Sequence, residues 1–355
     1  MFPLTNRVFS FAAVLALAGS SLIWAAPGPE SRAPLFLTAT NGATNYLAII
    51  NTRNQNVFYV PTGGAGGASG NAGGVAVNGE MAAVVNFNSK NITIFVRAGD
   101  TMQPTQMIKT AAQPVSVTFG QGHLVVLETT VAESFPMFGN LVMTSADGNV
   151  PLALADGSAA QIVSFNGGVV YTEKTGSVAE LNLSTDGFPG LSGPNVTVPL
   201  PASPNNNTPF GMVARDSNVY LTIAHSDLEA LVVNGKIVSM AAGPVPFMDK
   251  SGNITHAPCW NTLSGQFLYS ADSPGKQILR YLVSDANVFF DKAGIAVLSG
   301  APTDLFAAGS MLAVIDGGDG TNSNASVFTI SNEGELTLRF AVKIPSPING
   351  AAIVQ

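Results

Sequence analysis

Apolar and polar positions alternate along most of this 355-residue chain in a unit that recurs six times. Each unit opens on a small residue or a proline, continues into an apolar strand, turns at Gly, Asn, Asp or Ser, and ends in a second apolar strand. The units start 40, 47, 48, 49 and 44 residues apart, at Gly73, Gln113, Ala160, Thr208, Ala257 and Ala301. Repeats of this length, with short strands and tight turns, are typical of the blades of a β-propeller.

A third apolar strand follows each pair, and a weaker fourth strand usually comes after it, so four antiparallel strands are expected in each blade. A seventh blade is divided between two distant parts of the chain. Residues 346–355 repeat only the first strand, whereas residues 35–61 contain the other three. We therefore predict an all-β, seven-bladed β-propeller whose ring is closed by pairing of the C-terminal strand with the N-terminal strands. Two β-sandwiches, a solenoid, and a ring of six or eight blades are the alternatives.

The first 26 residues have the features of an export signal. Arg7 lies near the start, an apolar run extends from Phe9 to Trp24, and Ala25 and Ala26 precede Pro27. The apolar run has about 15 residues, fewer than the roughly 20 that cross a bilayer, so a cleaved signal is expected rather than a membrane anchor. We predict a signal peptide over 1–26, an N-terminal extension over 27–34 and a single propeller domain over 35–355, in a secreted protein.

The composition supports this fold and narrows the choice of partners. Charged residues make up only 10% of the chain, which disfavours long amphipathic helices, while 37 Gly and 22 Pro favour strands joined by tight turns. The net charge is −7 and no basic cluster is present, which argues against a nucleic-acid partner. We expect a monomer without a membrane span that binds a small molecule or a glycan.

Propeller geometry indicates where a site would lie. The loops before each first strand, and those between each second and third strand, emerge together on one face around the axial channel; we call it the mouth face. Histidines there can transfer protons, and gathered carboxylates can bind calcium or divide into acid and base roles. Ordinary turn-forming residues are the alternative. We predict catalytic roles for His225, His256 and Glu128, and ligand binding by Asn86, Gln113, Glu133, Glu173, Asp227, Asp272 and Asp316. No metal site or cofactor is assigned, with a calcium ion at the mouth left open.

Four further features of the sequence are interpreted as structural or as modification sites. The single cysteine, Cys259, lies beside Trp260 in an apolar strand, which favours a buried side chain over a reactive thiol. His123 opens a second strand on the opposite face and is expected to be structural. The Gly-rich residues 62–72 lack the lysine and the strand–turn–helix context of a phosphate-binding loop. Acceptor sequences for N-glycosylation occur at Asn91, Asn182, Asn195, Asn206, Asn253 and Asn324.

The repeats resemble the lactonase-like seven-bladed propellers, described as 3-carboxymuconate-cyclase-like or 6-phosphogluconolactonase-like. The resemblance covers nearly the whole chain after residue 26. It rests on the divided closing blade and on the segments GGAGGASGNAGGVAVNGEMAAVVNFNSKNITIF and QPVSVTFGQGHLVVLETTVAES. It implies hydrolysis of a lactone, or the reverse ring closure, at the channel mouth. An extracellular protein that binds a ligand, glycan or surface without catalysis is the second hypothesis, and a scaffold in a wall or matrix is the third.

Overall fold

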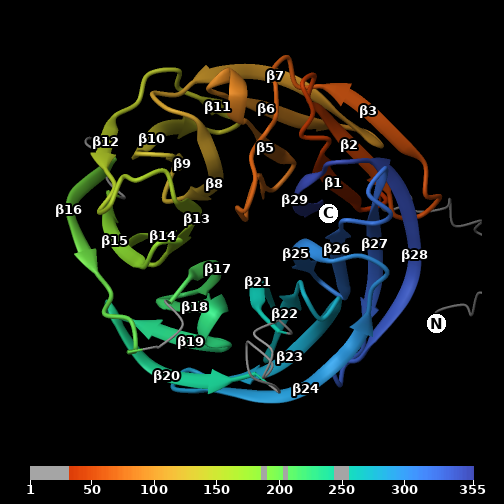
Figure 1. The fold of residues 1–355 in the computed structure, drawn as a ribbon. Coiled ribbons are helices and arrows are strands. Elements are labelled where there is room, and N and C mark those ends of the chain that lie inside the picture. The colour runs from red at the N-terminus through yellow and green to blue at the C-terminus, as the bar shows by residue number, and fades with distance from the viewer. Residues whose placement is uncertain (1–31, 185–189, 203–206, 244–255) are drawn as a thin grey trace, which may run out of the picture. The chain divides into compact units, whose positions relative to one another are not determined.

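The computed structural model describes residues 32–184, 190–202, 207–243 and 256–355. These residues form seven antiparallel β-sheets around one central axis (Figure 1). The predicted all-β, seven-bladed propeller is therefore confirmed. Blade 1 contains β29, β1, β2 and β3, and blades 2 to 7 follow in chain order from β4 to β28. The predicted signal peptide, residues 1–26, lies outside the described residues, as do residues 27–31.

The strands have the same order in every blade, from the axis outwards. The first strands are β29 (Asn349–Val354), β4 (Val75–Asn78), β8 (Pro114–Gly120), β13 (Ala159–Phe165), β17 (Pro209–Arg215), β21 (Pro258–Ser264) and β25 (Pro302–Ala308). The second strands are β1 (Leu35–Ala39), β5 (Met81–Asn86), β9 (His123–Glu128), β14 (Gly168–Glu173), β18 (Asn218–Ile223), β22 (Phe267–Asp272) and β26 (Met311–Asp316). The short helices η1 (Phe87–Ser89) and η2 (Ala224–Ser226) follow β5 and β18.

In the outer half of each blade, the third strand is mostly buried and the outermost strand is more exposed. The third strands are β2 (Tyr46–Asn51), β6 (Asn91–Ala98), β10 (Val131–Phe138), β15 (Ser177–Leu183), β19 (Leu228–Val233), β23 (Gln277–Val283) and β27 (Asn322–Ile330). The outermost strands are β3 (Val57–Pro61), β7 (Thr101–Lys109), β11 (Leu141–Val142) with β12 (Gly148–Pro151), β16 (Leu191–Thr197), β20 (Lys236–Ala242), β24 (Val288–Val297) and β28 (Leu336–Pro345).

The ring is closed as the sequence predicted. In blade 1, β29 pairs with β1, so that Leu35 lies opposite Val354 and Phe36 opposite Ile353. Blade 1 then packs against blade 7 through a cluster of buried apolar side chains that includes Phe36, Ile50 and Ala313. Because strand side chains alternate between two faces and each blade is covered on both, apolar residues fill the space between neighbouring blades.

Blade 3 departs from the predicted pattern, because its fourth strand is interrupted. One part of β10 pairs with β12 and the other part with β11. The segment between β11 and β12 is held by Asp147, whose carboxylate accepts a 2.6 Å hydrogen bond from Ser134 Oγ and lies 3.0 Å from His123 Nε2. His123 thus has a structural contact on the face opposite the mouth.

The Gly-rich segment 62–74 crosses the axis on the mouth face. Its Asn71 carbonyl accepts a 3.0 Å hydrogen bond from Trp260 Nε1 in blade 6, and the Ala72 amide donates to Ala160 O in blade 4. Asn41 fastens the middle of the segment, because its Oδ1 accepts hydrogen bonds from the amides of Gly67 and Ala68. The segment therefore covers the mouth end of the axial channel.

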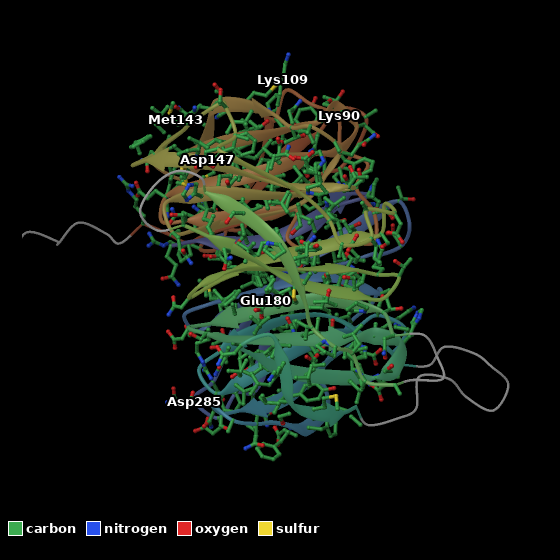
Figure 2. The ribbon with its side chains drawn as sticks, turned by 90° about the vertical axis from the view of Figure 1, so that its left-hand side faces the viewer. Lys90, Lys109, Met143, Asp147, Glu180 and Asp285 are labelled. Atoms are coloured by element: carbon green, nitrogen blue, oxygen red, sulfur yellow. The ribbon has the colours of Figure 1, made fainter. Side chains whose placement is uncertain are left out.

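Figure 2 shows the two faces of the ring from the side. Lys90, which follows η1, lies towards the mouth face, whereas Asp147 and Asp285 lie on the opposite side. Among the described residues, no helix combines the length and the apolar character that a bilayer crossing requires.

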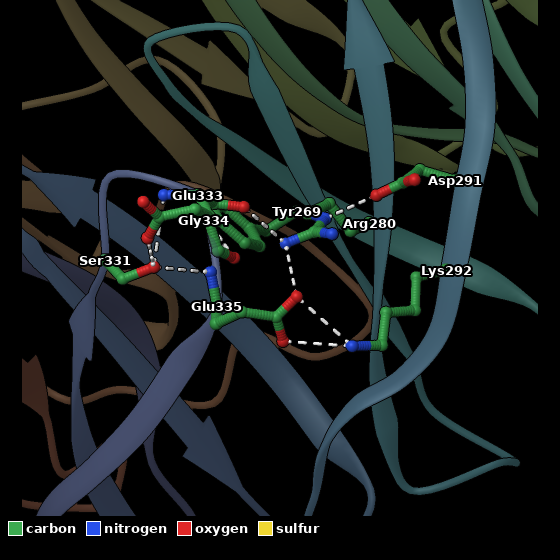
Figure 3. A network of polar contacts seen from close by, with 8 residues as sticks. All are labelled: Tyr269, Arg280, Asp291, Lys292, Ser331, Glu333, Gly334 and Glu335. Atoms are coloured by element: carbon green, nitrogen blue, oxygen red, sulfur yellow. Dashed lines mark hydrogen bonds and ion pairs between the residues drawn. The ribbon is translucent and has the colours of Figure 1, made fainter.

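In the outer part of the ring, the largely buried Arg280 of blade 6 contacts Asp291 of its own blade at 2.5 Å. It also reaches the β27–β28 turn of blade 7, where it donates to Glu333 O at 2.9 Å and lies 3.2 Å from Glu335 (Figure 3). Lys292 adds a second contact to Glu335. This network links the outer parts of the two blades.

Candidate functional site

Five of the predicted mouth residues end a second strand, and all five are buried. Their side chains bind neighbouring loops. Glu173 accepts hydrogen bonds from the amides of Leu154 and Ala155, in the loop that leads into its blade. Buried acceptors of this kind satisfy loop N–H groups that would otherwise lose their water partners. The five are Asn86, Glu128, Glu173, Asp272 and Asp316.

Glu128 and Glu133 form a pair of buried carboxyl groups in blade 3. Burial, and then the interaction with Glu133, raise the pKa of Glu128 to about 9. Glu128 also accepts a hydrogen bond from the Ala112 amide, and Glu133 accepts one of 3.0 Å from the Ala111 amide. The fully covered Glu128 is therefore protonated at neutral pH. Gln113, half-buried in the same loop, contacts Thr129 at 3.5 Å.

His256 lies between two aspartates where blades 5 and 6 meet. Its Nε2 is 2.5 Å from Asp227 Oδ1 and its Nδ1 is 2.8 Å from Asp272 Oδ2. These contacts are ion pairs rather than well-aligned hydrogen bonds. Burial opposes charge on the imidazole, but the two carboxylates outweigh it and raise the pKa of His256 to about 9. Asp272 also accepts hydrogen bonds from Gln277 and from the Ala257 amide.

Two cavities of about 530 and 640 Å³ open on the mouth face over blades 4, 5 and 6, and both are lined by Lys174, Thr175, Thr208 and His225. We call them together the mouth pocket. Lys174 follows β14, Thr208 precedes β17 and His225 lies in η2. Loops of the two predicted classes from adjoining blades therefore meet here, as propeller geometry requires.

Polar contacts orient the side chains of the mouth pocket. His225 Nδ1 is 2.8 Å from Thr208 Oγ1. Lys174 Nζ donates a 2.6 Å hydrogen bond to Gly70 O of the Gly-rich segment and lies 6.0 Å from the centre of the Phe210 ring. Burial lowers the pKa of Lys174. The pocket thus holds an imidazole and an amine beside an aromatic wall.

The thiol of Cys259 also lines the mouth pocket. Burial, and then the charges of Asp272 and Glu229, raise its pKa to about 12. The group is therefore a thiol at neutral pH and a poor nucleophile, as expected, although its side chain is partly exposed rather than buried as the sequence predicted.

The structure brings only one predicted catalytic residue, His225, to the mouth pocket. His256 and Glu128 are fully buried, and Glu133, Asp227 and Asp316 are nearly so. Asp227 directly follows η2, so the Asp227–His256 contact holds the turn that carries His225. The predicted roles of the buried residues in catalysis or ligand binding stay predictions.

Two buried carboxyl groups were missed by the sequence analysis. Asp304 lines an axial cavity of about 230 Å³ beneath the Gly-rich segment, and burial raises its pKa to about 7. Burial also raises the pKa of Glu229 to about 7, where its carboxylate accepts a 3.2 Å hydrogen bond from Asn261. In the sequence, Asp304 and Glu229 each stand as the single acid within an apolar strand, and this pattern could have identified both as buried carboxyl groups.

In the described part of the chain, no group of three or more His, Cys, Asp or Glu side chains is arranged to hold a metal ion. Calcium at the mouth stays a hypothesis without a ligand set among these residues. Glycosylation acceptors Asn206 and Asn253 lie outside the described residues.

Comparison with known proteins supports the fold. No protein-family model and no curated protein matches the sequence. A protein from Lactobacillus plantarum has a similar structure, with a TM-score of 0.67, 14% identity, and coverage of 91% of this chain and 100% of that one. The periplasmic gluconolactonase of Pseudomonas aeruginosa gives a TM-score of 0.65 at 14% identity, with 91% and 99% covered.

A more distant match is a catalytically inactive virginiamycin B lyase from Staphylococcus aureus with quinupristin. Its TM-score is 0.53 at 13% identity, and the match covers 81% of this chain and 93% of that one. At identities this low, the structural similarity shows a shared fold but does not show that the proteins catalyse the same reaction. The resemblance inferred from the repeats is thus confirmed at the level of fold: the chain has the architecture of the lactonase-like seven-bladed propellers.

Proposed function

We propose that this chain is a lactonase-like propeller that binds a small lactone in the mouth pocket and hydrolyses it. The observation that carries the proposal is the meeting of His225, Thr208 and Lys174 in one pocket, on the face where three blades contribute loops. The gluconolactonase of similar fold gives secondary support.

In the proposed reaction, His225 is the general base. The contact between Thr208 Oγ1 and His225 Nδ1 orients the imidazole, which takes the proton from water. The resulting hydroxide attacks the lactone carbonyl, and the ring C–O bond breaks. The departing ring oxygen takes the proton back from the imidazolium, which leaves a hydroxy acid. Lys174, when protonated, stabilises the developing negative charge on the carbonyl oxygen.

The proposed substrate carries no phosphate. Lys174 is the only lysine or arginine among the described residues that line the mouth pocket, and it already donates a hydrogen bond to Gly70 O. A phosphosugar needs several cationic or bidentate partners. An uncharged lactone, such as a sugar δ-lactone, matches this lining better.

The test is a panel of γ- and δ-lactones, with acid release followed by pH-stat titration. His225→Ala is expected to lower kcat by about 100-fold or more, because a general base contributes on that scale. Lys174→Met is expected to lower kcat by a smaller factor than His225→Ala does. Lys276→Met is the matched control, since Lys276 is an exposed lysine on the mouth face that does not line the pocket. Equal turnover by wild type and His225→Ala would contradict the proposal.

Glu128→Gln and His256→Asn test the remaining predicted catalysts in the same assay. Both side chains are fully buried, so we expect effects on stability that exceed any effect on kcat.

A binding protein without catalysis is the second candidate. It is favoured by one observation, that no carboxylate lines the mouth pocket among the described residues. Thermal stabilisation by a lactone or its hydroxy acid, without turnover across the panel, would support this candidate over hydrolysis.

We also propose that the chain is secreted after removal of residues 1–26, on the basis of the N-terminal pattern. N-terminal sequencing of protein recovered from the medium of an expressing host tests this. Retention of Met1 would contradict it.

A further inference from the structure

A second pocket lies on the mouth face, where blades 7 and 1 meet. It has a volume of about 340 Å³ and shares no lining residue with the mouth pocket. Two tyrosines, three hydroxyl side chains and a proline dominate its lining: Tyr46, Tyr59, Thr40, Thr44, Ser346 and Pro345. We call it the tyrosine pocket.

The strand register explains why the two tyrosines meet. Ala48 of β2 lies opposite Tyr59 of β3, and Tyr46 lies opposite Pro61. Side chains two residues apart share a face of the sheet, so Tyr46 and Tyr59 are diagonal neighbours on the face of blade 1 that Ala48 turns towards blade 7. Both rings therefore border the groove between the two blades.

Phe58, the residue before Tyr59, points the other way. It lies opposite Ile49, whose side chain packs in the cluster shared by blades 1 and 2. Phe58 and Tyr59 are nevertheless equally accessible, at 46% and 44% exposed. Partial burial raises the pKa of Tyr59, as expected if one part of its side chain is covered by the groove.

The lining has the chemistry of a site for an uncharged sugar ring. Among the described residues, no charged side chain lines the pocket, which leaves no partner there for a phosphate or a carboxylate. Aromatic faces carry partial negative charge and suit the C–H groups on one face of a pyranose. The hydroxyls of Thr40, Thr44 and Ser346 can exchange hydrogen bonds with sugar hydroxyls at the rim. Apolar walls with a few polar groups are usual for small-molecule sites of this size.

From these observations we infer that the tyrosine pocket binds one uncharged pyranose unit of an oligosaccharide, through Tyr46 and Tyr59. This site is separate from the mouth pocket. It would hold a glycan chain on the face where the mouth pocket opens, whether or not the mouth pocket hydrolyses lactones.

The test measures binding of cellotriose, N,N′,N″-triacetylchitotriose, maltotriose and mannotriose at millimolar concentration, by saturation-transfer NMR and by tyrosine fluorescence. At least one trisaccharide is expected to bind wild type, and Tyr59→Ala is expected to weaken that binding by about tenfold or more. Phe58→Ala is the matched control, with equal exposure on the opposite face of the strand, and should bind as wild type does. Glucose 6-phosphate should not bind.

Thermal denaturation of each variant establishes that it is folded, and Tyr59→Phe provides a second variant that keeps the ring and should keep most of the affinity. Binding of none of the four trisaccharides, or equal loss in Phe58→Ala and Tyr59→Ala, would overturn the inference. Lactone turnover in Tyr59→Ala should equal that of wild type, so failure here and failure of the proposed hydrolysis are distinguishable.

Discussion

At the scale of single residues, burial decides what the acids at the ends of the second strands can do. Asp316 illustrates this, because its Oδ1 accepts hydrogen bonds from the Gly318 amide and from Asn324. The carboxylate fixes the loop through Oδ1, and because the side chain is nearly fully buried, a ligand has little access to it. In blade 5 the corresponding position is Ile223, and there the turn is held by Asp227 and His256 instead.

The buried His256 and Glu128 are expected to make stability fall as pH rises. The pKa of His256 is raised from 6.5 to about 9, so its stabilising charge is fully present below 6.5 and is lost as pH rises through 9. Protonated Glu128 acts in the same direction, because its pKa is raised from 4.5 to about 9. Asp227 and Asp272 are the carboxyl groups that face the imidazole.

Urea unfolding at pH values across this window measures the effect. The free energy of unfolding should decline with pH in wild type, and His256→Asn and Glu128→Gln should each show a shallower decline. The same slope in all three proteins would mean that neither group titrates as the contacts indicate.

The described glycosylation acceptors differ in how accessible their amides are. Asn182 is exposed, whereas Asn91 is buried and donates its amide to Ser89 O. The amides of Asn195 and Asn324 are also hydrogen-bonded, to Pro151 O and to Asp316. In a host that glycosylates secreted proteins, we expect Asn182 to carry a glycan and Asn91 to be unmodified, as measured by peptide mass spectrometry. Full occupancy at Asn91 would contradict the observed burial.

At the scale of elements, the Gly-rich segment 62–74 is the one that shapes the mouth pocket most directly. It covers the axis, and its Gly70 carbonyl holds Lys174 at the mouth pocket. Glycine is required where the segment passes other backbone: a Cβ on Gly66 would lie 2.4 Å from Asn41 Cα. The segment is therefore both a cover for the channel and a wall for the pocket.

Asn41→Ala should loosen this segment. The substitution removes the acceptor of two amides and the donor to Ala68 O, and it places alanine at a φ of 52°. We expect a loss of about 2–4 kcal/mol in unfolding free energy, and faster hydrogen exchange at Gly67 and Ala68. Asn54→Ala, at an exposed turn position, is the control and should change stability by about 0.5 kcal/mol or less. Unchanged exchange at Gly67 would contradict the fastening role of Asn41.

At the scale of the whole molecule, repeat spacing was sufficient to predict the ring and its closing blade, because each strand pair has the same apolar pattern and the same turn residues. The interrupted outer strand of blade 3 was not predictable in this way, since it depends on the contacts of Asp147 with Ser134 and His123. Both loop classes predicted for the mouth face contribute residues to the mouth pocket.

The direction of the side chains in those loops was not predictable. Glu173 and Lys174 are adjacent in sequence, yet the first is buried as a loop acceptor and the second lines the mouth pocket. A spacing pattern does not contain the three-dimensional partners that decide between these two outcomes, such as the amides of Leu154 and Ala155.

Closure of the ring should be essential for cooperative folding. Deletion of residues 348–355 removes β29, exposes the edge of β1 and uncovers apolar side chains between blades 1, 2 and 7. We expect a large loss of soluble protein and a broad, non-cooperative thermal transition, measured by calorimetry. Removal of exposed Gln355 alone is the control. Normal yield and an unchanged Tm in the longer deletion would argue against a stabilising role for β29.

The pairing of β29 with β1 also determines when during synthesis the protein can become native. Leu35 and Val354, which face each other in the finished blade, are among the earliest and the latest residues of the ring to be translated. Until β29 is made, β1 presents an unpaired edge, and contacts this far apart in sequence form slowly. The edge of β1 therefore stays unpaired in the growing chain for as long as the other six blades are being made.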